Sequence, residues 1–225
     1  MKRSLFLLLL VPFLAAQATE VEITAEPSHH LALENEYVRV FKVEVPPNTA
    51  TLMHHHRHDY VAVMIGDSHL SNEVEGKPPV EVNFANGATT FASGNFAHIV
   101  RNLSEQPFRN VTIELMQDEK LRQTPSHWPA AAEETNFPGG KRKTLFVKDG
   151  VRVSEIELEA GAVLASHHHD RPHLVVAISD LSDVEGFGPA HQRFGYGDIK
   201  WFPADYTHEL NNKANVQVRF VTVEF

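Results

Sequence analysis

Two histidine-rich stretches carry the residues best suited to chemistry. "HHHRHDY" begins at His54, and "HHHDRPH" begins at His167. Side chains at positions i and i+2 of a β-strand point to the same face, so His54 converges with His56, and His167 converges with His169. Imidazole nitrogens are good ligands for Zn, Cu, Fe and Ni. Each stretch therefore predicts two ligands of a transition-metal site, and a further ligand has to come from elsewhere in the chain.

The two stretches belong to an internal repeat. "VRV" and "HHH" both recur further along the chain at one common offset, at Val151 and His167. In the later part of each copy the offset is slightly shorter, and there His98 is answered by His208. A nearly constant offset of this kind indicates one structural unit used twice. His98 and His208, one in each copy, are the expected third ligands.

The repeated unit has the pattern of β-strands throughout. Short alternating or β-branched runs such as "YVRVFKVEV" and "HLVVAI" are separated by clusters of Gly, Pro, Asn and Asp. No segment shows a sustained helical period. The pattern predicts an all-β chain made of two sandwiches or barrels.

The histidine spacings resemble the two motifs of the cupin superfamily. The first motif reads Gly, five residues, His-x-His, three or four residues, Glu, six residues, Gly; the second reads Gly, five residues, Pro-x-Gly, two residues, His, three residues, Asn. In the second copy the matching residues are Gly161, His167, His169, Gly197, Pro203, His208 and Asn212. In the first copy they are His54, His56, Gly87, His98 and Asn102. The resemblance, to a two-domain bicupin of the cupin type-2 conserved barrel kind, implies two tandem jelly-roll β-barrels.

The chain departs from the cupin pattern at the glutamate ligand. Tyr60 stands at that position in the first copy, and His173 stands there in the second. The resemblance thus implies a second site of four histidines, namely His167, His169, His173 and His208. It implies a first site of His54, His56 and His98 with the phenol of Tyr60, which binds metal poorly unless it is ionised. His58 is an alternative to Tyr60, although the motif places it in a turn. Asn48, Asn95 and Asp205 stand where the motifs have glycine.

Ligand sets without a carboxylate have a chemical consequence. A divalent ion bound only by neutral groups keeps its full charge and is a stronger Lewis acid. Four imidazoles closed around zinc in a tetrahedron would be structural. Octahedral Fe, Ni or Mn held by the same four would keep two positions open for an oxygen ligand. The predicted cofactor is a divalent transition metal, Fe, Ni, Mn or Zn, and both roles stay open.

Other candidate residues are less specific. Arg39 and Arg152, the arginines of the "VRV" repeats, share the parity of neighbouring apolar residues and are candidates for binding a carboxylate substrate. A salt bridge at the barrel rim is the commoner outcome for such an arginine. Tyr60 and Trp201 are expected to line the pockets. His29 has no counterpart in the repeat and receives no role. No catalytic acid or base stands out.

The N-terminus matches a secretory signal peptide over residues 1–18. Lys2 and Arg3 precede an apolar run of about ten residues, too short for the roughly 20 residues of a membrane span, and Ala18 ends a small-residue cleavage site. The chain is therefore expected in the periplasm or outside the cell, with no membrane attachment after cleavage. It contains no cysteine, so disulfides are excluded.

The chain that follows residue 18 is long enough for two domains of roughly 100 to 150 residues. We assign residues 19–117 to the first barrel, 118–143 to a connector rich in Pro, Gly and charge with a short helical turn near 130–134, and 144–225 to the second barrel. Without the signal peptide, 18 basic residues face 29 acidic ones, a formal charge of −11. Such a surface repels phosphate backbones. Nucleic acid is excluded as a partner, a small-molecule ligand is expected, and a homodimer is left open.

These features favour an exported metal-binding bicupin, and two functions are compatible with it. One is a metal-dependent dioxygenase or isomerase acting on a small oxygen-rich metabolite. The other is a non-catalytic protein that binds a sugar or organic acid and contains a structural metal. The sequence leaves open whether the chain is an enzyme.

Overall fold

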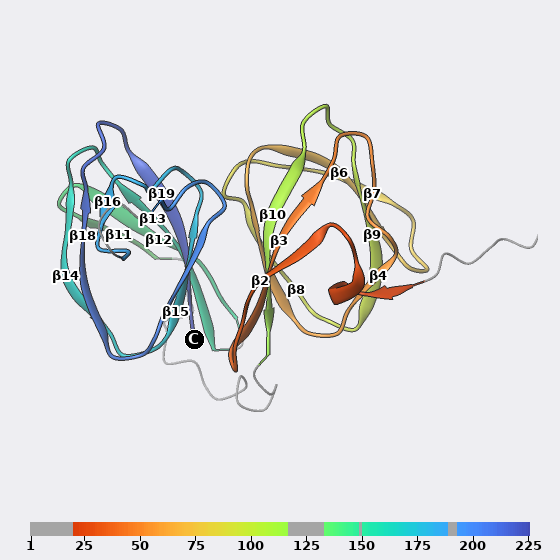
Figure 1. Cartoon of the computed structure of the whole chain (residues 1–225), viewed down its shortest axis with the longest axis horizontal. Coiled ribbons are helices and arrows are strands. Elements are labelled where there is room, and N and C mark those ends of the chain that lie inside the picture. Colours follow the sequence, from red (N-terminus) through yellow and green to blue (C-terminus); the bar gives the residue numbers. More distant parts are fainter. Residues whose placement is uncertain (1–19, 117–132, 149, 189–192) are drawn as a thin grey trace, which may run out of the picture.

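The computed structural model describes residues 20–116, 133–148, 150–188 and 193–225. The chain forms two β-structured halves that lie side by side (Figure 1). Among the described residues the regular structure is β-strand apart from one short 3-10 turn, η1 (Ile23–Ala25). The predicted all-β fold class is thereby confirmed. No described helix is long and apolar enough to cross a membrane. The expected signal peptide, residues 1–18, and residues 118–132 of the expected connector lie outside the described residues.

The first barrel consists of two sheets of five strands each. In spatial order, the first sheet contains β1 (Val21–Glu22), β4 (His54–His56), β9 (Phe96–Asn102), β6 (Ser68–Val74) and β7 (Val80–Phe84). The second sheet contains β2 (His29–Glu34), β3 (Val38–Val45), β10 (Phe108–Leu115), β5 (Tyr60–Met64) and β8 (Thr89–Ala92). The histidine triplet thus occupies a strand of its own.

The described residues of the second barrel form one sheet of six strands and one of three. The larger contains, in order, β11 (Glu134–Phe137), β12 (Gly140–Lys148), β13 (Val151–Leu158), β19 (Val218–Glu224), β15 (His173–Ala177) and β17 (Ile199–Phe202). The smaller contains β14 (Val163–His169), β18 (Tyr206–Asn212) and β16 (Val184–Glu185). Strand β11 and the start of β12 fall within the segment that the sequence suggested as connector. Glu134, expected to end a helical turn, begins a strand instead.

The strand boundaries follow the repeat. The starts of β3 and β13 are separated by the offset of the early part of the repeat, and the starts of β9 and β18 are separated by the offset of its later part. Asn48, Asn95 and Asp205, which replace motif glycines, have φ angles of 56°, 62° and 55°. Asn and Asp are the residues besides glycine that most readily adopt this left-handed conformation. The turns of the motif therefore survive the loss of their glycines.

The apolar core has three parts, one inside each barrel and one between them. All five residues of β5 are buried because its two faces pack on different partners. Ala62 and Met64 face the interior of the first barrel, whereas Val61 and Val63 face the second barrel. Burial on both faces explains why this strand is apolar throughout instead of alternating with polar residues. The two barrels consequently share a packed interface.

Candidate metal centres

Strand pairing brings the two histidine motifs of each copy together. His54 on β4 lies directly opposite His98 on β9, and His167 on β14 lies directly opposite His208 on β18. In each barrel these residues come from the sheet that holds the triplet, and inward-facing positions alternate along its strands. The cross-strand pairs are what the repeat predicted: a distant histidine for each triplet.

The first barrel gathers four imidazoles. His29, His54 and His56 each offer a ligand atom, and these atoms lie within 4.8 Å of one another. The Nε2 atom of His98 lies 3.1 Å from Nε2 of His56, and the rings of His98 and His54 have centroids 4.6 Å apart. His29 comes from β2 in the facing sheet and received no role from the sequence. The three ligands and a phenol that the sequence indicated are here accompanied by a fourth histidine.

Oxygen atoms orient three of these rings. The Nδ1 contacts are His29 with a carboxylate oxygen of Glu26 at 2.7 Å, His54 with the carbonyl oxygen of Leu52 at 2.9 Å, and His98 with the amide oxygen of Asn72 at 2.7 Å. Because these oxygens accept hydrogen bonds, each Nδ1 carries a proton, and in the neutral rings of His54 and His98 the Nε2 atom keeps its lone pair. Outer hydrogen bonds of this kind fix the orientation of metal-binding histidines.

Three histidines of the first cluster, His54, His56 and His98, are uncharged at neutral pH. Burial lowers the pKa of His54 to about 4 and that of His98 to about 3, and it lowers the pKa of His56 further still. Neutral imidazole is the form that binds metal. Tyr60 stacks on His56 with ring centroids 4.3 Å apart, and burial raises its pKa. Its phenol therefore stays protonated in this apolar setting, where it lines the cavity.

The second barrel brings three imidazoles together. His167, His169 and His208 offer ligand atoms within 4.8 Å of one another. Within the described structure, both ring nitrogens of His208 and the Nε2 atom of His169 are buried without a hydrogen-bond partner. Buried polar atoms are normally paired, so these nitrogens fit the requirement for free donor atoms. Burial lowers the pKa of His208 to about 4, which keeps it neutral.

His173 lies beside this group of three. Its ring stacks on His169 at 3.9 Å and on Phe202 at 4.9 Å, and its own pKa is lowered by burial to about 3. Tyr60 stacks on His56 in the same way in the first barrel. The motif position that holds glutamate in cupins therefore places a ring against a histidine in both barrels. A fourth ligand role for His173 remains a prediction.

Both repeat arginines are engaged in ion pairs. Arg39 contacts Glu34 at 2.7 Å and Glu114 at 3.5 Å, and Arg152 makes two contacts with Glu224, at 2.6 and 2.8 Å. These contacts correspond to the salt-bridge alternative considered from the sequence. Trp201, expected to line a pocket, lines a surface hollow of about 550 Å³ together with His208. It also packs at the interface between the barrels, where its ring centroid lies 5.6 Å from those of Tyr37 and Phe225.

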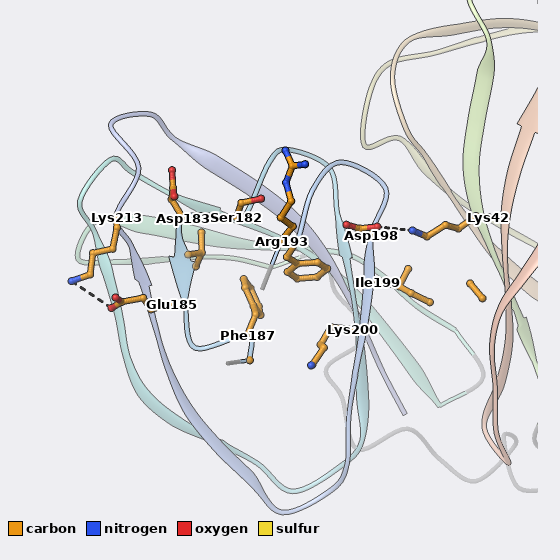
Figure 2. Close-up of a pocket in the computed structure, with 14 residues that line it drawn as sticks. Lys42, Ser182, Asp183, Glu185, Phe187, Arg193, Asp198, Ile199, Lys200 and Lys213 are labelled. Carbon is orange, nitrogen blue, oxygen red and sulfur yellow. Dashed lines mark hydrogen bonds and ion pairs between the residues drawn. The ribbon is translucent and has the colours of Figure 1, made fainter. Parts of the chain in front are cut away.

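Each histidine cluster opens into a small cavity. The cavity of the first barrel measures about 180 Å³ and that of the second about 190 Å³. A larger hollow of about 650 Å³ lies on the second barrel where it faces the first, with a charged lining (Figure 2). There the ammonium of Lys42 lies 2.6 Å from a carboxylate oxygen of Asp198, joining the two barrels. No residue of either cluster lines this hollow, so we place the chemistry in the two small cavities.

A third grouping with metal-ligand chemistry lies on the surface. His168, which alternates outward between the two inward histidines of β14, has Nε2 3.1 Å from Asp170 and 3.8 Å from Asp205. All three residues are exposed. Solvated groups of this kind bind metal weakly, and any count of metal ions has to allow for them.

Comparisons with known proteins identify the fold. No family model matches the sequence, and no curated protein matches it. Among solved structures, AerE from Microcystis aeruginosa is 12% identical with a TM-score of 0.60, and the match covers 88% of this chain and 97% of AerE. Oxalate decarboxylase from Bacillus subtilis, in a study of its Mn(II) centres, is 14% identical with a TM-score of 0.57, covering 87% of this chain and 74% of that one. The likeness shows that the chain has the cupin fold.

Proposed function

We propose that the chain is a bicupin whose second barrel binds a divalent transition metal through His167, His169 and His208 and presents it to a small oxygen-rich metabolite. The observation that carries the proposal is the convergence of three imidazoles, with ligand atoms within 4.8 Å of one another, on a cavity of about 190 Å³. Three protein ligands leave coordination positions open, as in catalytic metal sites.

An ion held by these imidazoles would supply Lewis-acid activation of an oxygen atom on the bound metabolite. The histidines position that oxygen, and the surrounding apolar side chains exclude water from it; these include Ile156, Leu164, Val175, Leu210 and Phe220. A dioxygenase or isomerase activity is the form of catalysis that fits these groups best. In the described structure, Glu224 is the only carboxylate lining the cavity, and Arg152 holds it as an ion pair.

The second candidate function is a structural metal, and the first barrel favours it. Its four imidazoles equal the number of ligands in a closed zinc site. His54, His56 and His98 are 0%, 2% and 6% exposed, so solvent has little access to them. In this arrangement the first ion braces the barrel. The chain as a whole could then be either an enzyme or a binding protein for a sugar or organic acid.

Metal analysis of the untagged mature protein tests the proposal. After dialysis against a weak chelator, which removes ions from the exposed His168 grouping, we expect two equivalents of Fe, Ni, Mn or Zn per chain. The Mn(II) centres of oxalate decarboxylase make Mn²⁺ the first ion to use for reconstitution. In the Mn²⁺-loaded protein, water-proton relaxation should detect exchangeable water on the ion of the second barrel. Failure to bind any of these ions would overturn the proposal, and an ion without exchangeable water would support the structural role.

Export is a separate part of the proposal. The basic, apolar and small-residue segments of residues 1–18 support cleavage after Ala18. Intact-mass analysis of the protein from fractionated cells should give a chain that begins at Thr19 and is found in the periplasm or medium. A full-length chain in the cytoplasmic fraction would contradict it.

A further inference from the structure

Arg142 occupies the place in the second barrel that His29 occupies in the first. His29 on β2 lies opposite Val43 of β3, and Arg142 on β12 lies opposite Ile156 of β13. Val43 and Ile156 are equivalent positions of the repeat, because the offset between them is that of the two histidine triplets. Where the first barrel adds a fourth imidazole, the second barrel therefore adds a guanidinium group.

The side chain of Arg142 faces the histidine cavity. It lines the same cavity as His167, His169 and His208. Its strand neighbour Lys141 points the other way, with its ammonium 3.5 Å from Glu157, as alternation along a strand requires. Burial lowers the pKa of His167, and among the smaller causes is the positive charge of Arg142. The guanidinium and the histidines are therefore close enough to interact.

The charge of Arg142 is uncompensated within the part of the chain that the structure describes. No carboxylate there makes an ion pair or hydrogen bond with it. The one acidic residue in the cavity lining, Glu224, is held by Arg152 through contacts of 2.6 and 2.8 Å. A partly buried cation is costly unless an anion accompanies it. The cavity is therefore suited to an anionic guest.

The cavity limits the size and nature of that guest. Its volume of about 190 Å³ corresponds to about six water molecules at ~30 Å³ each, below the range of roughly 300 to 1,000 Å³ for drug-sized ligands. Apolar residues form most of the remaining wall, among them Phe137, Ile156, Leu164, Val175, Leu210 and Phe220. A sugar, with a hydroxyl on nearly every carbon, would leave many polar groups unpaired against this wall.

We propose that Arg142 binds the carboxylate of a small organic acid in the second barrel and directs a neighbouring oxygen of that acid toward the three histidines. The planar fork of a guanidinium matches a carboxylate with two parallel hydrogen bonds. The inference deepens the proposed function and rests on it, because the histidines would hold the ion that the second oxygen meets. It names the substrate class as short 2-oxo or 2-hydroxy acids.

Binding of glycolate and its neutral isostere glycolamide tests the proposal. Isothermal titration of the full mature protein, both loaded with Zn²⁺ and metal-free, should show glycolate bound at least tenfold more tightly than glycolamide. Arg142→Gln should weaken glycolate binding at least tenfold and abolish the preference over glycolamide, while Arg142→Lys should restore part of it. Lys141→Gln, which removes an equal charge from the outer face of the same strand, should bind glycolate like the wild type.

Several results would overturn this proposal. The first is that the wild type binds glycolate and glycolamide with equal affinity. The second is that Arg142→Gln binds glycolate as tightly as the wild type does. The third is that neither the Zn²⁺-loaded nor the metal-free wild type shows saturable binding of glycolate, pyruvate or acetate. The comparison of acid with amide uses the wild type alone, so it stands even if Arg142→Gln does not fold. Metal content is measured separately. A second barrel that takes no metal but binds glycolate through Arg142 would refute the proposed function and uphold the arginine site.

Discussion

Each barrel places three equivalent histidines on equivalent strands, but the surroundings of these histidines differ between the two barrels. In the first barrel β1 pairs with β4, with Val21 opposite His54, and covers the outer edge of the triplet strand. In the described part of the second barrel β14 pairs only with β18, and His167 and His169 stay partly exposed. The two histidine motifs thus determine where the three shared histidines lie. The strands that precede the motifs determine how far each cluster is enclosed and which fourth group, His29 or Arg142, lies beside it.

The largest expected difference concerns metal content. His98→Ala should remove the ion of the first barrel alone, and His208→Ala should remove that of the second alone. Each loss should exceed 100-fold in affinity, since even an outer hydrogen-bond partner of a metal ligand contributes 10- to 100-fold. Stoichiometry by elemental analysis measures the effect, with His168→Ala as a control that removes only a surface histidine. Loss of both ions in either variant would mean that the sites are not independent.

The sequence alone predicted the fold and the convergence of three histidines in each barrel. The two motifs have internal spacings that cross-strand pairing requires, so His98 and His208 could be assigned without coordinates. The position of Tyr60 in the cavity wall was predicted. The stacking of Tyr60 on His56 and of His173 on His169 was not, because the motif gives the strand of each residue and not its ring contacts.

His29 escaped prediction for a related reason. Its contribution depends on β2 lying in register with β3 in the facing sheet, a long-range pairing that no local spacing encodes. Comparison of the two copies could not reveal it either, since Arg142 takes its place in the second barrel. A repeat identifies what two copies share, and the groups that distinguish the sites lie in the segments that differ.

Substitutions of His29 and Arg142 test whether the fourth group beside each set of three histidines is what makes the metal affinities of the two sites differ. His29→Ala should weaken metal binding in the first barrel at least tenfold through the loss of one ligand. Arg142→His should strengthen metal binding in the second barrel by about tenfold, because a neutral donor replaces a charge that repels the ion. Competition with a fluorescent chelator measures both affinities. If neither substitution alters the metal affinity, the difference between the two sites comes from the cover that β1 provides in the first barrel and not from His29 or Arg142.

A smaller contrast concerns one carboxylate in each barrel. Glu114 and Glu224 are equivalent in the repeat and are 1% and 6% exposed. Burial raises the pKa of Glu114 to about 7, since Arg39, 3.5 Å away, is shared with Glu34. Burial acts in the same direction on Glu224, but contacts from His169 and Arg152 outweigh it and lower the pKa to about 2. The equivalent carboxyl group is thus costly to ionise in the first barrel, as Glu114, and stabilised as an anion in the second, as Glu224.

The two glutamates should therefore affect stability with opposite signs. A carboxyl whose folded-state pKa is raised contributes stability below pH 4.5 and loses it as the pH rises through about 7. Glu114→Gln should accordingly stabilise the metal-free protein at pH 8 relative to wild type by on the order of 1 kcal/mol, allowing for solvent screening, and this gain should vanish at pH 5. Glu224 contributes stability above pH 4.5 that is lost only near pH 2, so Glu224→Gln should destabilise the protein at both pH 5 and pH 8.

The urea concentrations at the unfolding midpoints of the two variants and the wild type, at pH 5 and pH 8, measure these effects. If the two substitutions changed stability at pH 8 in the same direction, the assignment of different charge states to Glu114 and Glu224 would be contradicted.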